Sequence, residues 1–118
     1  YFSSLLFGES STMSEEAAML GIPSVYLFNN STIYTKHIEE QYGLIFNYSE
    51  SDEDQLKAIQ KGIEILSGNY ELNYWKSKAD QIIEDHIDVT SFMIWFTENY
   101  PESKKTMLND PDYQLKFK

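Results

Sequence analysis

The sequence predicts an α/β fold: the carboxyl-terminal part of a Rossmann-like domain, with about three parallel strands, followed by a helical extension. Over residues 3–48, short apolar runs alternate with helical patterns, which is the order of successive βαβ units. A glycine closes each helical pattern in that region. Beyond residue 50 the apolar residues recur every three or four positions, so the rest of the chain is predicted to be helical.

Residues 3–8 are predicted to form the first strand and to lead directly into the first helix. Ser11 or Thr12 is the expected N-cap of this helix, and Thr12 with Glu15 fits a capping box. The helix is expected to run to about residue 20, with three apolar side chains on one buried face: Met13, Ala17 and Leu20.

The first helix is expected to end at Gly21 in the left-handed conformation, and Pro23 prevents its continuation. A second strand is predicted at Ser24–Phe28, followed by a loop. Gly43 ends the next helical pattern. The remaining elements of this region are a helix at about 33–41 and a strand at 44–48.

Three more helices are predicted after residue 50, the first opening at Ser51 and the last spanning Val89 to about Tyr100, with Asp88 as its cap. Their apolar residues have helical spacing: Leu56, Ile59, Ile63 and Leu66 in the first, and Leu72, Trp75, Ala79 and Ile82 in the second. We expect residues 1–100 to form the partial Rossmann-like domain and residues 101–118 to form a loosely held tail.

The last of these helices does not carry a single apolar stripe. Val89, Phe92 and Phe96 share one face, whereas Ile94 and Trp95 point elsewhere. Two interpretations follow: the helix is buried in the core of its own domain, or it packs against another domain or a second copy.

Composition and charge limit the classes of partner. The net charge is −10, from 19 acidic and nine basic residues, which disfavours long nucleic acids and anionic membranes. No apolar run reaches the roughly 20 residues that a membrane span requires. The chain has no cysteine, so disulfides and thiolate metal sites are excluded and a reducing, cytoplasmic location is expected.

A hydroxyl-rich turn follows the first predicted strand, in the sequence Gly8-Glu9-Ser10-Ser11-Thr12. A helix that begins at the carboxyl end of a parallel strand presents unpaired backbone N–H groups, and α/β proteins commonly hold phosphates there. These groups can bind phosphate without a basic side chain, so the acidic composition does not exclude a mononucleotide. The turn therefore predicts a nucleotide-type ligand.

The most specific pattern in the chain is Thr12-Met13-x-x-Glu16-Ala17-Ala18-x-Leu20-Gly21-x-Pro23. It resembles the carboxyl-terminal domain of glycosyltransferase-B-like proteins, in particular a family of uncharacterised prokaryotic proteins related to UDP-N-acetylglucosamine 2-epimerase. Ile87-Asp88-Val89-Thr90-x-Phe92 is also similar to the end of that family. The resemblance extends over most of residues 1–100, with the specific motif confined to the first 25.

The resemblance implies that the turn presents backbone amides to the diphosphate of a nucleotide sugar and that a glutamate in the first helical turns binds the ribose. By position, Ser10, Ser11 and Thr12 would lie at the phosphates and Glu16 at the ribose. A carboxylate is a natural acceptor for a vicinal diol. Relatives have glycines at the positions of Ser11 and Thr12, so here hydroxyls would have to donate to the phosphate; the departure weakens the case for nucleotide binding but not for the fold.

These residues also have purely structural interpretations. Ser11 and Thr12 are good helix caps without any ligand, and Glu15 is expected to close the capping box. A glutamate such as Glu16 in a first helical turn is favoured by the helix dipole alone.

The other candidate side chains carry less information. The loop Asn29–Thr32 would face a sugar if the fold is as implied, while His37 is expected at the surface. His86 lacks well-spaced metal ligands nearby, and we predict no metal and no cofactor. No nucleophile–base pair or P-loop is present, so the catalytic residues stay unknown.

Three functions remain open at this stage. The first is the nucleotide-sugar-binding part, with a UDP-sugar as the ligand, of a glycosyltransferase or sugar epimerase whose catalytic groups lie in another domain; this piece would then be inactive alone. The second is a non-catalytic binding module that keeps the fold, which the hydroxyls of Ser11 and Thr12 favour. The third is an interaction domain that uses the helix containing Phe92 and Phe96.

The expected macromolecular partners follow from the predicted sheet. The chain opens without Met inside an apolar stretch, which suggests the carboxyl-terminal piece of a longer protein. The edge of the first strand and the last helix would then contact a missing amino-terminal domain or a second copy.

Overall fold

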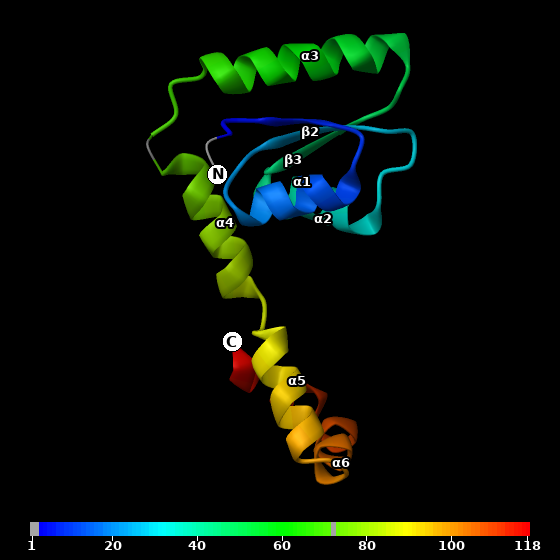
Figure 1. Ribbon diagram of the computed structural model, residues 1–118, viewed down its shortest axis with the longest axis vertical. Helices are drawn as coiled ribbons and strands as arrows, with labels where there is room; N and C mark the ends of the chain where they lie inside the picture. Colours follow the sequence, from blue (N-terminus) through cyan, green and yellow to red (C-terminus); the bar gives the residue numbers. More distant parts are fainter. Residues whose placement is uncertain (1–2, 72) are drawn as a thin grey trace. The chain divides into compact units, whose positions relative to one another are not determined.

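A computed structural model describes residues 3–71 and 73–118 (Figure 1). Among these residues, three parallel strands form one sheet and the other regular elements are helical, which confirms the predicted α/β class. The strands are β1 (Leu6–Gly8), β2 (Ser24–Leu27) and β3 (Ile45–Tyr48). They lie in the sheet in chain order, so β2 is the central strand.

The chain separates into two compact units, one ending at Ile82 and the other spanning Ile83–Lys118. The sequence had suggested a boundary at residue 100 instead. The first unit contains the sheet, and the second is wholly helical apart from its connections.

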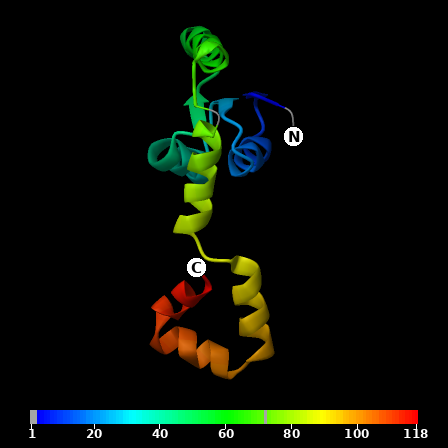
Figure 2. The same cartoon turned by 90° about the vertical axis from the view of Figure 1, so that its left-hand side faces the viewer.

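In the first unit the sheet lies between two layers of helices (Figures 1 and 2). The connecting helices α1 (Ser11–Met19) and α2 (Ile33–Tyr42) cover one face of the sheet. The longer helix α3 (Asp52–Ser67) contacts β2 and β3 from the other face. Helix α4 (Tyr74–Asp85) follows; its predicted apolar position Leu72 lies outside the described residues.

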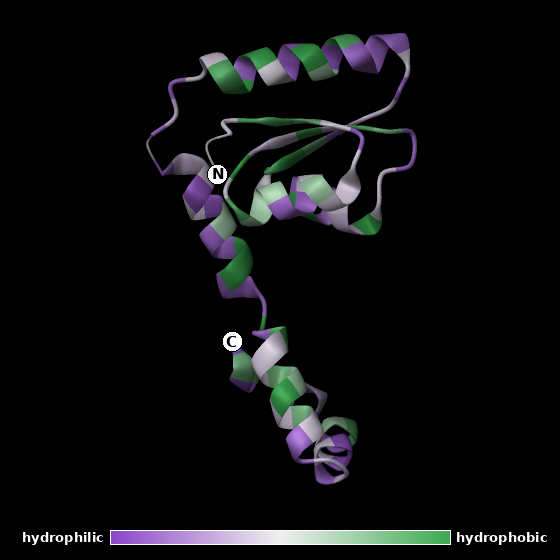
Figure 3. Ribbon diagram, in the orientation of Figure 1, coloured by the Kyte–Doolittle hydropathy of each residue, from purple (hydrophilic) through white to green (hydrophobic). Residues whose placement is uncertain are grey.

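Each face of the sheet has its own buried cluster, because successive side chains of a strand point to opposite faces. Val25 packs toward α3 with Ala58 and Ile65. The next residue, Tyr26, packs toward the opposite layer, with further buried residues from α1, α2, α4 and the start of β3: Ala18, Tyr42, Leu44, Ile45, Ala79 and Ile82. Trp75 of α4 packs against both clusters, and hydropathy colouring shows the strands as mainly hydrophobic (Figure 3).

Two glycines end helices as the sequence predicts. Gly21 and Gly43 have φ angles of 74° and 60°, in the left-handed region that favours glycine. Gly21 is required for a second reason, because a Cβ there would lie 3.0 Å from the Cα of Lys76. The absence of a side chain at residue 21 therefore lets α4 approach the first βαβ unit closely.

The first strand is shorter than predicted. Pairing with β2 begins at Leu6, opposite Ser24, instead of at residue 3. The residue before Ser24 is Pro23, which has no N–H to donate, so it cannot extend the ladder as a donor. Its carbonyl still accepts a hydrogen bond from the Leu6 N–H at 3.0 Å.

The start of α1 also differs from the prediction. Ser10, and neither Ser11 nor Thr12, is the N-cap, and its hydroxyl accepts from the Met13 N–H at 3.3 Å. The capping box of Thr12 with Glu15 is therefore wrong, because the third residue after the true cap is Met13 and not a glutamate.

The buried face of α1 also differs from the prediction, in two of its three residues. Met13 and Leu20 are 55% and 61% exposed, whereas the buried residues are Ser14, Ala17 and Ala18. Small side chains on this face allow α1 to lie close to β2, and the Ser24 hydroxyl donates to the Ser14 carbonyl at 3.4 Å. Apolar spacing alone had favoured the two large residues that the fold leaves at the surface.

The second unit consists of α5 (Val89–Glu98), α6 (Glu102–Asn109) and the 3₁₀ helix η1 (Pro111–Phe117). Most of the predicted tail at 101–118 is thus helical, in α6 and η1. Aromatic rings hold η1 to α5: Trp95 stacks on Tyr113 with ring centroids 4.8 Å apart, and Phe117 meets both Trp95 and Phe92.

Helix α5 matches neither predicted face in full. Phe92, Trp95 and Phe96 are half-buried in ring contacts of the second unit, while Val89 is 57% exposed. Trp95 thus shares a side with Phe92, which the sequence had separated. No residue of α5, all of which is described, is fully buried.

Candidate functional site

Three helices begin at the carboxyl edge of the sheet, each just after the strand that precedes it in the chain. Each is capped by a hydroxyl side chain: Ser10 for α1, Thr32 for α2 and Ser51 for α3. Each hydroxyl accepts from the backbone N–H three residues later, at 3.3, 3.0 and 3.3 Å respectively. Helix starts carry partial positive charge, so the backbone at this edge favours anions.

The start of α1 contains three of the four residues predicted to bind a ligand. Only Glu9 and Ser10 separate β1 from α1, so the first helical turn lies directly at the end of the strand. The Ser10 hydroxyl is engaged as the cap, whereas the N–H groups of Ser11 and Thr12 precede the first helical hydrogen bonds. These two amides are the donors that a phosphate could use.

Glu16, the fourth predicted residue, lies one turn further along α1 and is exposed. Thr12 is exposed as well, and residues four apart lie beside each other on a helix surface. A ligand held at the helix start would therefore be within reach of the Glu16 carboxylate. Ser10–Thr12 lie together in the first turn, and Glu16 lies on the next turn from them.

Glu15 has a different role from the predicted one. Its carboxylate accepts a hydrogen bond from the Thr32 hydroxyl at 3.4 Å, and Glu15 is partly buried. The contact connects α1 to the start of α2, which the capping-box prediction did not anticipate.

Other side-chain contacts connect the loops of this edge. Asn29 donates to the Glu50 carboxylate, and its side-chain oxygen accepts from the Glu50 N–H at 3.0 Å. On β3, the Asn47 side chain donates to Glu39 of α2 at 2.6 Å. Residues of the predicted sugar-contacting loop Asn29–Thr32 thus have structural partners, and these contacts hold the loops after β2 and β3 in place.

The electrostatics of the edge are mixed. The Ser49 hydroxyl donates to Asp54 at 2.5 Å, and this bond, together with that from the Ser49 N–H, holds the pKa of the Asp54 carboxyl below its usual value. Further carboxylates lie close to the helix starts in the sequence. Glu9 and Glu50 directly precede the caps of α1 and α3, and Glu15 and Glu16 lie on α1. Attraction for an anion would therefore come mainly from backbone amides and hydroxyls, because the one basic residue among the first four positions of α1, α2 and α3 is Lys36, the fourth residue of α2.

The histidines do not join this edge. His37 is exposed on α2, as predicted, and its ring meets the Tyr42 ring edge-on with centroids 6.0 Å apart. His86 is also exposed, beyond the end of α4. In the part of the chain that the structure describes, no group of three or more His, Asp or Glu residues is placed to hold a metal ion.

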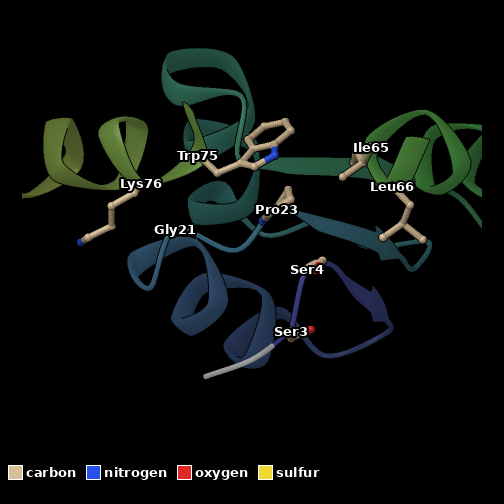
Figure 4. A pocket seen from close by; sticks show the side chains of 8 residues that line it. All are labelled: Ser3, Ser4, Gly21, Pro23, Ile65, Leu66, Trp75 and Lys76. Atoms are coloured by element: carbon tan, nitrogen blue, oxygen red, sulfur yellow. The ribbon is translucent and has the colours of Figure 1, made fainter. Parts of the chain in front are cut away.

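A cavity of about 310 Å³ lies at the other end of the sheet (Figure 4). Its lining residues precede β1 and β2 or come from the end of α3 and the start of α4: Ser3, Ser4, Gly21, Pro23, Ile65, Leu66, Trp75 and Lys76. The Lys76 side chain extends away from the other lining residues and is paired with Asp80 at 2.8 Å. Ligands of open parallel sheets bind at the carboxyl ends of the strands, so this cavity is at the opposite edge from the predicted site.

Sequence reasoning missed the contacts between separate loops, because they join residues 17 to 21 positions apart, as in Glu15–Thr32 and Asn29–Glu50. One signal was present: polar residues follow all three strands, and the carboxyl ends of parallel strands meet at one edge. In comparisons with protein-family models, curated proteins and solved structures, no match to this chain was found. For the described residues, no helix has the length and apolar character to cross a bilayer.

Proposed function

We propose that the first unit binds a nucleotide sugar, with a UDP-sugar as the ligand, at the carboxyl edge of its sheet. The phosphates would accept hydrogen bonds from Ser11 and Thr12, and the ribose would donate to Glu16. The observation that supports this most is the short connection from β1 to α1, which places the start of a nine-residue helix at the end of a parallel strand. The exposed pair Thr12 and Glu16 on one helix face adds to it.

We further propose that the chain is part of a glycosyltransferase- or epimerase-like protein of the glycosyltransferase-B-like superfamily. The proposal rests on the motif from Thr12 to Pro23 together with the parallel sheet that carries it. The catalytic groups would then come from another domain. The cytoplasmic location and the absence of a cofactor stay predictions.

An alternative is a binding or interaction module without catalysis. The observation that favours it is the acidic surrounding of the helix start, where Glu9, Glu15 and Glu16 lie near the amides and would weaken binding of an anion. This alternative predicts either binding without turnover by the complete protein or no nucleotide response at all.

The test is a calorimetric titration of the chain with UDP and with 2′-deoxy-UDP. A hydrogen bond to a charged group contributes about 1.5–3 kcal/mol, so UDP should bind about tenfold or more tightly than its deoxy analogue. In Glu16→Ala this preference should disappear and UDP affinity should fall by a similar factor. The matched control is Glu40→Ala, which removes an exposed carboxylate from α2 and should change neither affinity.

Two results would contradict the proposal. One is the absence of saturable binding of either nucleotide up to about 10 mM, which corresponds to less than about 3 kcal/mol of binding energy. The other is saturable binding that discriminates the 2′-hydroxyl equally well in wild type and Glu16→Ala. The second result would leave nucleotide binding in place but move the ribose away from Glu16.

A further inference from the structure

Helix α3 carries an exposed aliphatic stripe on the side that does not face the sheet. Its members are Leu56, Ile59, Ile63 and Leu66, which are 63%, 51%, 60% and 61% exposed. The face that packs on the sheet consists instead of Ala58, Gly62 and Ile65, all buried. Figure 3 shows hydrophobic residues recurring along α3. A helix with four large apolar residues exposed beside its buried face is shaped for a second contact.

The spacing of the stripe identifies the type of contact. Its members are separated by three, four and three residues, which is the a/d pattern of a two-helix coiled coil. The pattern covers 11 of the 16 residues of α3, from Leu56 to Leu66. A partner that matches this surface is therefore another amphipathic helix with the same spacing.

The charges around the stripe permit that partner to be α3 of a second copy. The positions that flank the stripe on either side, e and g of the same pattern, are Gln55, Gln60, Gly62 and Ser67, and none of them is charged. The basic residues of α3 are paired within the helix, Lys57 with Glu53 and Lys61 with Glu64, both at 2.7 Å. A chain of net charge −10 would repel itself over most surfaces, so an uncharged border on this exposed aliphatic stripe favours self-association there.

Charge also selects the direction of pairing. The first turn of α3 contains Asp52, Glu53 and Asp54. A parallel pair would place these six carboxylates of two copies side by side. An antiparallel pair separates them by the length of a 16-residue helix, about 24 Å, and sets opposite ends of the two helix dipoles together.

We propose that two copies of this chain associate through an antiparallel pair of α3 helices. Leu56 of one copy then faces Leu66 of the other, and Ile59 faces Ile63. The two-fold arrangement uses the same surface twice, as homodimers commonly do. This contact is separate from the sheet edge and from α5, and it does not depend on nucleotide binding.

The first test is sedimentation equilibrium of the full chain from about 1 µM to about 1 mM, the range in which a small interface dissociates. Wild type should pass from monomer to dimer with concentration. The double variant Ile59→Gln and Ile63→Gln should raise the dissociation constant at least tenfold. The control is Ile33→Gln with Ile83→Gln, two residues that are 84% and 54% exposed outside α3, and it should dimerise like wild type.

The second test uses the absence of cysteine in the sequence. The double variant Leu56→Cys and Leu66→Cys should form disulfide-linked dimers on oxidation, because the two positions face each other across an antiparallel pair. Leu56→Cys alone should give no more linked dimer than Leu20→Cys, an exposed control on the end of α1. Circular dichroism verifies that each variant retains the wild-type helix content, as expected for exposed positions.

Three results would overturn the proposal. If the chain stays monomeric over the whole concentration range, the stripe on α3 does not mediate a dimer. A dimer that persists unchanged in the Ile59→Gln and Ile63→Gln variant uses another surface. Efficient cross-linking of Leu56→Cys alone means that the helices pair in parallel.

Discussion

The two units of this chain bury different kinds of side chain. In the first unit, Val25, Leu44 and Ile45 are completely inaccessible to solvent between the sheet and its helices. In the described part of the second unit, the one fully buried residue is Ser103, whose hydroxyl donates to the Phe96 carbonyl at 2.6 Å. Half-buried rings take the place of an aliphatic core there, with Trp95 and Tyr113 stacked 24° from parallel.

Size explains this difference. The second unit is the 36 residues Ile83–Lys118, and a unit below about 40 residues buries too little surface for a conventional core. Large aromatic rings bury much area per residue and gain further from edge and stacking contacts. We therefore expect the stability of the first unit to depend on complete burial and that of the second unit to depend on ring contacts. The second unit should be the less stable of the two.

The largest effect is expected for Leu44→Ala in the first unit. Leu44 is fully buried next to the sheet, and such truncations cost about 2–5 kcal/mol because they lose apolar contact and leave a cavity. Unfolding should be followed by the fluorescence of Trp75 in a Trp95→Phe background, since the chain has two tryptophans, one in each unit. Ile33→Ala, at a position 84% exposed, is the control and should stay within about 0.5 kcal/mol of wild type.

A smaller and more local effect is expected for Trp95→Ala. The change removes ring contacts with Phe92, Tyr113 and Phe117 and should cost the second unit about 2–3 kcal/mol, less than for a fully buried tryptophan. Amide hydrogen exchange should speed up in α5 and α6 while the β2 amides remain protected. Equal acceleration in both units would mean that they unfold together, which would contradict the expected difference in stability between them.

The smallest effect concerns pH. The Ser91 hydroxyl donates to Asp88 at 2.6 Å and, with the Ser91 N–H, holds the pKa of this capping carboxyl below its usual value. A carboxyl with a lowered folded-state pKa stabilises the fold above its unfolded-state pKa, and the contribution is lost as the pH falls through the folded-state pKa. The second unit should therefore lose stability as the pH falls below about 4, the usual pKa of an aspartate.

Asp88→Asn isolates this contribution, because asparagine also caps helices but does not titrate in this range. The variant should be less stable than wild type at neutral pH and should approach it in acid, as measured in denaturant by the fluorescence of Trp95 in a Trp75→Phe background. The matched control is Glu98→Gln, which removes an exposed carboxylate near the end of the same helix and should leave the acid dependence unchanged. A constant difference between Asp88→Asn and wild type at all pH values would exclude the titration of Asp88 as its cause.

The comparison also shows which features sequence patterns can predict. Gly21 and Gly43 marked helix ends correctly, since few residues adopt positive φ without strain. The second strand was found because β2 is largely buried and its residues Val25–Leu27 form an apolar run. These features are determined by residues that are close in the sequence, so a single segment is sufficient to predict them.

The failures have one physical cause, which is that spacing does not say which partner covers a face. Met13 and Leu20 have the spacing of a buried face, yet small residues pack α1 on the sheet. The sequence of residues 101–118 is typical of a loosely held tail, but Tyr113 and Phe117 contact Trp95 of another helix. At the candidate site, the bond from Thr32 to Glu15 depends on where α1 and α2 meet, and the sequence alone did not locate it.

The most direct test of the proposed site is an amide NMR titration of the chain with UDP-N-acetylglucosamine, beside Glu16→Ala. The account predicts saturable shifts at the carboxyl edge, confined to residues 8–16 and the loop at 29–32, and weaker binding in the variant. A dispersed spectrum that stays unchanged, or shifts confined to Gly21, Trp75 and Lys76 around the cavity at the opposite edge, would contradict it.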